Sequence, residues 1–426
     1  MLTEIKNALK QAGISVWSVE RAEEHTAELF FIRRRLDTRR MKDTVKYHVR
    51  VYRDFEKDGK AMRGMASVSF APGQEEQEIL TTLREAYDAA AFVENPAYPL
   101  PEGLTGRAEA PKSRLAQMLP EEAALEMAEA AFSADHDARA FLNTMEVFAV
   151  QKETRLLTSQ GTDVAYGQYE VEGEFVTQCK EPEDVEVYRD FHYDDLNTEE
   201  LKKKVAEALQ YATDRTAAVP ALKTGSYDVI LSDDCVAEIL SYYVSRSQAG
   251  MIYAGYSQWK PGDPVQPEEG KGEQLNLTLH ASVPYSDEGI PMKDRPVVEN
   301  GKLLCCHGGS RFASYLGTEP TGDYSSFVCE NGTVSMKDMK KKPFLWPVIF
   351  SDFQMDDFSG HFGGEIRLAY WFDGERPRIV TGGSVNGSLL DCGGDMIFST
   401  EKMKSMRYEG PRAVLLKNIS IAGSEE

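Results

Sequence analysis

The sequence predicts an α+β fold: two N-terminal α+β units, each an antiparallel sheet with helices, followed by a mostly antiparallel β C-terminal domain. Three observations lead to this prediction. Apolar and polar residues alternate clearly near residue 45. Apolar residues recur at helical spacing in several segments before residue 250. Beyond Pro261, turns that end in glycine dominate and helical patterns nearly vanish, which favours hairpins.

The first unit, residues 1–110, is predicted to contain a helix, an extended region and a second helix. Leu2, Ile5 and Leu9 share one helical face. The alternation that follows predicts a half-buried antiparallel strand whose apolar face carries Val45, Tyr47, Val49 and Val51. Asp58-Gly59 then predicts a hairpin turn. A helix after Pro72-Gly73 is predicted from the spacing of Ile79, Leu80, Leu83, Tyr87 and Ala90.

A connector rich in proline and glycine separates this unit from the next. It runs from Glu94 to Pro120, and its composition disfavours regular structure. The second unit, residues 111–225, repeats the plan of the first. We expect a helix from Glu121 to Phe132, a strand from Tyr169 to Phe175 and a helix capped by Asn197.

The C-terminal domain, residues 226–426, opens with a buried strand from Tyr227 to Leu231 and a helix capped by Ser232 or Asp233. Further along, Asn300-Gly301, Asn331-Gly332 and Asp373-Gly374 each predict a hairpin turn. We expect the flanking strands at Pro296 to Glu299, Lys302 to Cys306, Ser326 to Cys329, Thr333 to Met336 and Leu368 to Phe372.

Charge and cysteine content narrow the class of protein. The formal net charge is −21, which repels phosphate polyanions and anionic lipid, so we expect neither direct nucleic-acid binding nor membrane binding. No apolar run approaches membrane-spanning length, and the charged N-terminus is unlike a signal peptide. The six cysteines include no Cys-x-x-Cys pair, which indicates reduced thiols and a cytoplasmic protein.

No catalytic cluster is evident in the chain. A zinc-peptidase helix needs two histidines on one face, and none of the seven histidines has such a partner nearby. Cys305-Cys306-His307 is predicted on a strand, where neighbouring side chains point apart, although a metal site gathered from distant segments stays open. We interpret the acidic pairs Asp287-Glu288 and Asp356-Asp357 as solvent-facing turns. The cysteines are expected to be buried and inert.

Several C-terminal segments together resemble the TldD/PmbA family. Ser286 to Pro291 (SDEGIP), Val297 to Leu303 (VVENGKL), Gly317 and Pro320 to Gly322 (PTG) match its C-terminal domain in order and spacing. Thr381 to Gly387 (TGGSVNG) is similar to its glycine-rich β segment, and Leu415 to Gly423 is similar to its terminal strand. With the two α+β units, the resemblance covers nearly the whole chain.

The resemblance implies a cytoplasmic peptidase system, also labelled modulator of DNA gyrase. In it, TldD-type subunits carry a His-Glu-x-x-x-His zinc helix and PmbA (TldE)-type partners do not. The corresponding segment here, Asp233 to Gln248, contains no histidine. Cys392 lies near the family's cysteine ligand without falling on it. No catalytic or metal residue can be carried over, and the chain resembles the PmbA/TldE branch.

Three functions follow from this reasoning. The leading one is a non-catalytic, peptide-binding subunit without a cofactor, paired with a zinc-bearing TldD-type relative. The others are an autonomous peptidase that uses a cysteine or a metal held by Cys392 and a distant histidine, and a homodimeric binding protein on the same scaffold. Unfolded peptide is the expected substrate. The family-motif positions expected at a peptide groove are Asp287, Glu288, Gly289, Asn300, Gly301, Thr321, Gly322, Gly382, Gly383 and Asn386.

Overall fold

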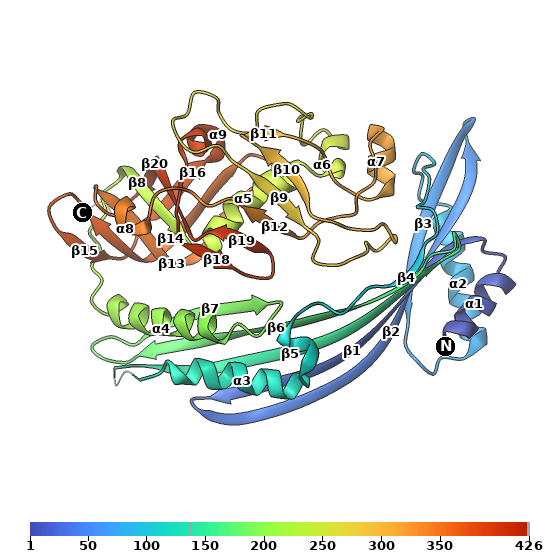
Figure 1. Ribbon diagram of the computed structural model, residues 1–426, viewed down its shortest axis with the longest axis horizontal. Helices are drawn as coiled ribbons and strands as arrows, with labels where there is room; N and C mark the ends of the chain where they lie inside the picture. Colours follow the sequence, from blue (N-terminus) through green and yellow to red (C-terminus); the bar gives the residue numbers. More distant parts are fainter. Residues whose placement is uncertain (137–138, 424–426) are drawn as a thin grey trace.

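The N-terminal half of the protein is built on one long sheet. The structure, a computed structural model, describes residues 1–136 and 139–423 (Figure 1). Seven strands pair in the order β3-β2-β1-β5-β6-β4, with β7 beside β6. Their bounds are β1 Val16–Ile32, β2 Arg35–Lys57, β3 Lys60–Phe70, β4 Thr105–Arg107, β5 Ala140–Thr158, β6 Asp163–Cys179 and β7 Val185–Tyr193. Because β1 pairs with both β2 and β5, the two predicted N-terminal units share this sheet. The domain boundary at residue 110 stays a prediction.

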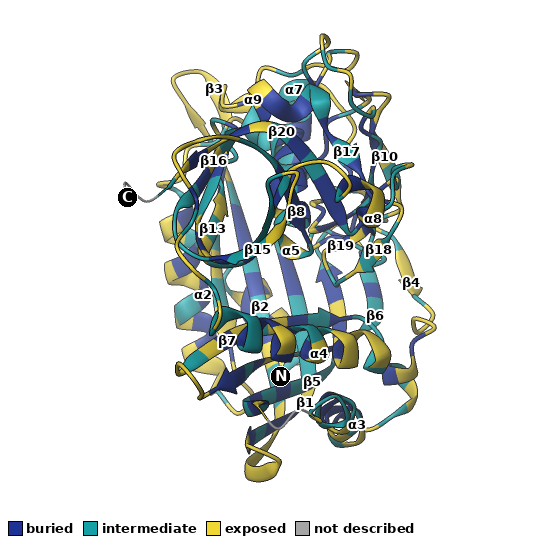
Figure 2. Cartoon of the chain, turned by 90° about the vertical axis from the view of Figure 1, so that its left-hand side faces the viewer, coloured by how far each residue is buried: buried dark blue, intermediate teal, exposed yellow. Residues whose placement is uncertain are grey.

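Four helices pack on the sheet, and all four were predicted from the spacing of apolar residues. They are α1 Leu2–Gln11, α2 Glu76–Ala90, α3 Pro120–Ser133 and α4 Thr198–Arg215. Val49 and Val51 of β2 are fully buried in a cluster with α1 and α2, while Val171 and Phe175 of β6 are buried in a cluster with α3 and α4. Figure 2 shows exposed positions on α3 and α4 and buried positions on the strands of the sheet.

Two predicted hairpin turns have the backbone that glycine and asparagine or aspartate favour. Asp58 and Gly59, between β2 and β3, have φ of 51° and 72°. Asn300 and Gly301, between β10 (Arg295–Glu299) and β11 (Lys302–Leu303), have φ of 50° and 71°. Positive φ at both central positions matches the right-handed twist of the flanking strands. The predicted turn at Asp373-Gly374 likewise joins β14 (His361–Phe372) to β15 (Pro377–Val380).

The C-terminal domain is rich in β structure, as the sequence predicted, and contains two further sheets. One has the order β11-β10-β9-β12-β19-β18. In the other, β13 pairs with both β8 and β14, so that β13, β8, β20, β16 and β14 close into a ring. The remaining bounds are β8 Gly225–Ser232, β9 Leu277–His280, β12 Ser326–Cys329, β13 Phe344–Met355, β16 Ser384–Ser388, β17 Ile397–Phe398, β18 Lys402–Lys404, β19 Tyr408–Pro411 and β20 Ala413–Ala422.

Helix α5 (Asp234–Arg246) belongs to the core that joins these two sheets. Its side chains cluster with Val229 of β8 in one sheet and Leu277 of β9 in the other. The other short elements are η1 Arg114–Gln117, α6 Ala249–Tyr253, α7 Ser310–Leu316, α8 Met336–Met339, α9 Leu389–Cys392 and η2 Gly393–Asp395. Within the described residues, the helices are all too short or too polar to cross a membrane.

Two predicted strand segments are wrong. Asn331-Gly332 does not close a hairpin, because β12 pairs with β9 and β19 and the chain after the turn forms α8. A Cβ on Gly332 would lie 2.0 Å from the carbonyl oxygen of Phe398, so the glycine permits a close backbone approach instead. The strand expected from Lys302 to Cys306 ends at Leu303.

Candidate functional site

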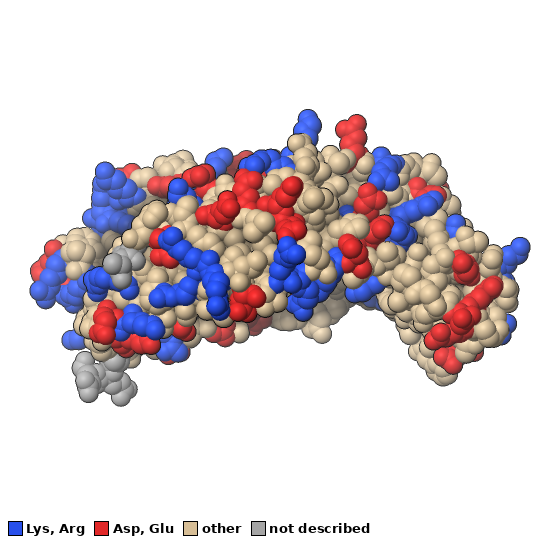
Figure 3. All heavy atoms as spheres, turned by 90° about the horizontal axis from the view of Figure 1, so that it is seen from below, with Lys and Arg blue, Asp and Glu red and all other residues tan. Residues whose placement is uncertain are grey.

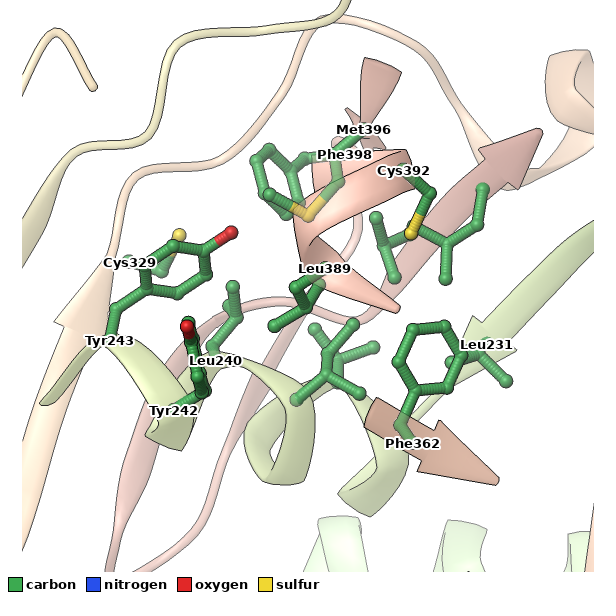
Figure 4. Packing of buried hydrophobic residues seen from close by; sticks show 14 of the residues in the cluster. Leu231, Leu240, Tyr242, Tyr243, Cys329, Phe362, Leu389, Cys392, Met396 and Phe398 are labelled. Carbon is green, nitrogen blue, oxygen red and sulfur yellow. The ribbon is translucent and has the colours of Figure 1, made fainter. Parts of the chain in front are cut away.

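Helix α5 is the segment that the family resemblance aligns with a zinc helix, and its inward face is apolar (Figure 4). Val236, Ile239, Leu240 and Tyr243 are buried on this face. Zinc is held in proteins by imidazole, thiolate and carboxylate groups, and these four residues offer none of them. The Cys235 thiol of α5 also packs against this core, but burial raises its pKa and keeps it protonated. The residues of α5 that point into the domain therefore do not fit a zinc site.

Tyr243 fills much of the space beside α5. Its ring is fully buried and stacks on Trp259, with ring centroids 6.2 Å apart and 14° between the planes. Its hydroxyl has no hydrogen-bond partner in the structure. Tyr242 packs edge-on against both rings, so an aromatic cluster lies at this end of the helix.

Cys392, the other residue considered for a metal, lies in the same core (Figure 4). Burial raises the pKa of its thiol to about 12, which keeps it protonated at neutral pH, whereas metals and nucleophilic reactions need the thiolate. Across residues 1–136 and 139–423, no group of three or more His, Cys, Asp and Glu side chains is placed to hold a metal ion.

Cys305, Cys306 and His307 lie beyond the end of β11 and contact different neighbours. Cys305 Sγ lies 3.6 Å from the carbonyl oxygen of Pro296, and Cys306 Sγ lies 3.6 Å from Thr318 Oγ1. His307 is buried, with Nε2 3.1 Å from the Val244 carbonyl oxygen. Burial lowers the pKa of His307 to about 4, so its ring is neutral at neutral pH.

The predicted groove positions Asp287, Glu288 and Gly289 lie where the N-terminal sheet meets the C-terminal domain. The Asp287 carboxylate accepts a 2.6 Å hydrogen bond from Arg50 of β2. Glu288 Oε2 accepts hydrogen bonds from both the backbone N–H and the hydroxyl of Ser310, each 2.7 Å long. A Cβ on Gly289 would lie 2.9 Å from Thr162 Cγ2. Asp287-Glu288 forms a turn, and Asp287 is exposed, as the sequence predicted. Glu288 is half-buried against Ser310, so the interpretation as solvent-facing is wrong for Glu288 alone.

Thr321 and Gly322 belong to the same cluster. Thr321 Oγ1 accepts a 3.0 Å hydrogen bond from the backbone N–H of Gly308, and Gly308 pairs with Gly322 in an isolated bridge. A Cβ on Gly322 would lie 2.9 Å from Ser286 Cβ. The structure thus brings together two family-like segments that are about thirty residues apart in sequence.

The environment of this cluster raises the pKa of two carboxyl groups, those of Glu288 and Asp323. Burial raises the pKa of Glu288 in spite of the opposing hydrogen bonds from Ser310. Burial also raises the pKa of Asp323, and the nearby Asp287 adds to that shift. The hydroxyl of Ser310 belongs to a residue only 3% exposed, which keeps it from a substrate. The contacts of this cluster connect the N-terminal sheet to the C-terminal domain.

The other predicted positions lie in separate places. The backbone N–H of Asn300 donates to Asn276 Oδ1 at 2.7 Å in the β10–β11 turn. Gly382 and Gly383 have φ of 83° and 82° in the turn between β15 and β16, and Asn386 pairs with Ser420 within the closed ring of strands. Their contacts are those of turns and strands within the C-terminal domain.

A pocket of about 380 Å³ lies between the N-terminal sheet and the C-terminal domain, and sequence reasoning missed it. One wall is the β6 segment from Tyr166 to Tyr169. The other walls come from the connector after β4, from the end of β7 and from the C-terminal domain, and include Ala108, Pro111, Lys112, Asp194, His280, Ser282, Pro284, Met292, Lys404 and Met406. No local sequence pattern indicates this pocket, because its walls come from segments that lie far apart in the sequence.

Comparison with known proteins identifies the family. The family model described as the PmbA/TldA metallopeptidase C-terminal domain matches residues 224–423. The solved structure of TldE from Thermococcus kodakarensis is similar with a TM-score of 0.79 and 17% identity, over 99% of this chain and 100% of that one. A proposed modulator of a DNA gyrase from Thermotoga maritima is similar with a TM-score of 0.77 and 17% identity, over 99% and 100%.

A third solved structure, a proposed modulator of DNA gyrase from Bacteroides thetaiotaomicron, has a TM-score of 0.76 and 14% identity over 99% of each chain. At these identities the structures establish the fold, while the family model carries the sequence relationship. No curated protein matches the chain. With the family's C-terminal domain in its sequence and the TldE fold along its length, this chain is a TldD/PmbA-family protein.

Proposed function

We propose that the protein is a non-catalytic, peptide-holding component of a cytoplasmic metallopeptidase system of the TldD/PmbA type. The observation that carries this proposal is the inward face of α5, where Leu240 and Tyr243 pack into the core. The family resemblance aligns this segment with a zinc helix. Apolar carbon atoms and an unionised phenol cannot replace zinc ligands. The chain therefore depends on a zinc-bearing relative for peptide hydrolysis.

The Cys392 thiol supports the same proposal. It is 6% exposed, and burial holds it in the neutral form that neither attacks a carbonyl nor binds zinc well. An autonomous cysteine or metal peptidase built on this residue would need the core around α5 to open. This favours the non-catalytic subunit over the autonomous enzyme.

The expected partners are a zinc-bearing relative and an unfolded peptide. All six cysteines are free thiols, in keeping with a reducing compartment. The face shown in Figure 3 carries basic and acidic side chains next to one another. Together with the net charge of −21, this mixture disfavours a phosphate backbone as a ligand.

Metal analysis and reconstitution test the proposal. We expect the lone chain to contain no stoichiometric zinc and to leave an unfolded peptide uncleaved, and we expect the mixture with a zinc-bearing relative from the same cell to cleave it. A relative whose zinc-helix histidines are replaced is the matched control and should leave the mixture inactive. Equally fast cleavage by the relative alone, or chelator-sensitive cleavage by the lone chain, would refute the proposal.

The mass of the protein in solution distinguishes the proposed mixed complex from the remaining alternative, a homodimeric binding protein. Light scattering of the chain alone and with the relative shows whether it forms a mixed complex or pairs with a second copy of itself. A stable homodimer that does not exchange with the relative would favour the homodimeric binding protein.

A further inference from the structure

Strand β6 has a gap in its pairing on one side. It pairs with β5 along its whole length, from Asp163 to Cys179. On the opposite side, β4 pairs only with Asp163 to Ala165, and β7 pairs only with Val171 to Cys179. Among the described residues, no strand pairs with 166–170 on this side. We call this segment, on its side away from β5, the β6 gap.

Backbone donors and acceptors in the β6 gap point toward the open side. The N–H of Asp163 donates to the carbonyl of Leu104, and the carbonyl of Ala165 accepts from the N–H of Ala108, both at 2.9 Å. In a strand, the N–H and C=O of one residue point to the same side, and the side alternates along the chain. The register with β5 is unbroken here, so the N–H and C=O of Gly167 and Tyr169 also point into the gap.

The pocket of about 380 Å³ lies against this edge, since Gly167 and Tyr169 both line it. The chain that leaves β4 bounds the pocket and is tied to the end of β7, because Ser113 Oγ donates to the Asp194 carbonyl oxygen and to Asp195 Oδ1, both at 3.0 Å. The gap is thus bounded by β4, the connector and β7. These three segments leave room for a single extended chain, but they block the approach of the sheet edge of a folded partner.

The dimensions suit a short stretch of peptide. Six residue steps separate Ala165 from Val171, about 20 Å at about 3.3 Å per residue. The pocket volume lies in the lower part of the range of about 300–1,000 Å³ for ligand clefts. Met292 and Met406 form part of the wall, and flexible thioether side chains adapt to different neighbours. Gly167 has no side chain of its own, and the ring of Tyr169 lies over it: a Cβ on Gly167 would be 3.0 Å from Tyr169 Oη.

We propose that the β6 gap binds an unfolded peptide substrate by strand addition, with three peptide residues opposite Gly167 to Tyr169. The backbone groups of Gly167 and Tyr169 supply up to four hydrogen bonds, and the pocket takes the alternate side chains of the peptide. This inference rests on the proposed peptide-holding function and gives that function a location. The lone chain is expected to bind peptide here without the zinc-bearing relative.

Fluorescence anisotropy with an unstructured, fluorescein-labelled peptide of Ser, Thr, Ala and Val tests the site. We expect saturable binding to the full chain, and binding about tenfold weaker or worse for the same peptide N-methylated at alternate amides, which lacks backbone donors. In the wild type, saturating peptide should slow the hydrogen exchange of the Gly167 and Tyr169 amides.

Gly167→Pro removes one N–H that faces the gap and should weaken binding about tenfold. Asp190→Pro is the matched control. Residues of β7 such as Phe191 and Tyr193 pair with gap-side residues of β6, so Asp190 directs its N–H to the outer edge of β7. This variant should bind peptide like the wild type. Ser282→Trp, an exposed position on the pocket wall, blocks the pocket without touching the sheet and decides the matter if Gly167→Pro folds poorly.

Wild-type affinity in both Gly167→Pro and Ser282→Trp, unchanged amide exchange in saturating peptide, or no binding of any unfolded peptide would each overturn the site. These outcomes are separable from failure of the proposed function. If Ser282→Trp leaves the KM of the reconstituted pair unchanged, the site is wrong while the partnership stands. If the lone chain binds peptide in the gap but no relative gains activity from it, the partnership is wrong.

Discussion

Arg50 of β2 and Asp287 join the N-terminal sheet to the C-terminal domain across 237 positions of sequence. Arg50 Nη2 donates to Asp287 Oδ2 at 2.6 Å, and Nη1 donates to the Asp287 backbone carbonyl at 3.2 Å. The Arg50 side chain is 20% exposed, so the pair is partly shielded from solvent. The family-like segment around Asp287 therefore holds the two halves of the chain in register.

A double-mutant cycle should detect this contact. We expect Arg50→Met and Asp287→Asn to be coupled by about 1 kcal/mol in the free energy of unfolding, because the hydrogen bond from Nη2 to Oδ2 joins two charged groups and the Arg50 side chain is partly buried. Urea denaturation of the single and double variants gives the coupling. The exposed pair Arg107 and Glu153, 2.9 Å apart within the N-terminal half, is the control and should show a coupling near zero. Equal coupling energies in both pairs would contradict the claim that Arg50 and Asp287 hold the two halves of the chain together.

Replacing Glu288 should change how stability depends on pH. Burial raises the folded-state pKa of Glu288, so its contribution to stability is present at low pH and is lost as pH rises through that pKa. Glu288→Gln stays uncharged and can accept both hydrogen bonds from Ser310 through its amide oxygen. We therefore expect the variant to gain stability relative to the wild type between about pH 4 and pH 7.

Urea denaturation across that pH range measures the effect. Ser310→Ala serves as the comparison, because it removes the hydroxyl donor and should cost about 1 kcal/mol. A difference between Glu288→Gln and the wild type that stays constant with pH would show that Glu288 does not titrate differently in the folded state.

Two buried tyrosines make a matched pair. Both Tyr243 and Tyr408 are fully buried, but Tyr408 Oη donates to the Pro411 carbonyl at 3.0 Å, while Tyr243 Oη has no partner. Tyr243→Phe should stabilise the protein by about 1 kcal/mol, because it removes an unsatisfied hydroxyl, and Tyr408→Phe should destabilise it by about 1–3 kcal/mol. Thermal and urea unfolding measure both. Equal losses would indicate that the Tyr243 hydroxyl has a partner in solution.

His307 should make the protein sensitive to acid. Its folded-state pKa is about 4 because of burial, whereas an unfolded histidine titrates near about 6.5. The unfolded chain therefore binds the extra proton first, and stability falls by up to about 3 kcal/mol as the pH drops through this window. His307→Gln should remove this dependence, as measured by urea midpoints between pH 7 and pH 4.5.

His192 provides a contrast of opposite sign. Its Nε2 lies 2.9 Å from Glu170 Oε2, and although burial opposes the shift, this carboxylate raises the pKa of the imidazole. Its contribution is present below the unfolded-state pKa and is lost as pH rises. His192→Gln should therefore reduce the stability gained at mildly acidic pH. If the free energy of unfolding changes with pH in the same way in His307→Gln and His192→Gln, the opposite pKa shifts given to the two histidines are wrong.

Local sequence predicted the structure correctly at helices and turns whose conformation is decided by neighbouring residues. The helical spacing of Ile79, Leu83 and Ala90 predicted α2, and positive φ at Asp58-Gly59 and Asn300-Gly301 follows from the residues in those turns. Asn331-Gly332 misled the prediction because Gly332 meets the backbone of Phe398, which is remote in sequence.

Local patterns were enough to predict helices α1 to α5, parts of the long strands β2 and β6, the β-rich C-terminal domain and the family resemblance. Periodicity, turn residues and motifs are properties of neighbouring residues. Three features depend on the packing of the whole chain: Asp287 contacts Arg50, Glu288 is half-buried against Ser310, and β4 and β7 leave residues 166–170 of β6 unpaired on the side away from β5. These features depend on which distant segments pack together. That choice is made by burial and backbone pairing over the whole chain, which no window of neighbouring residues contains.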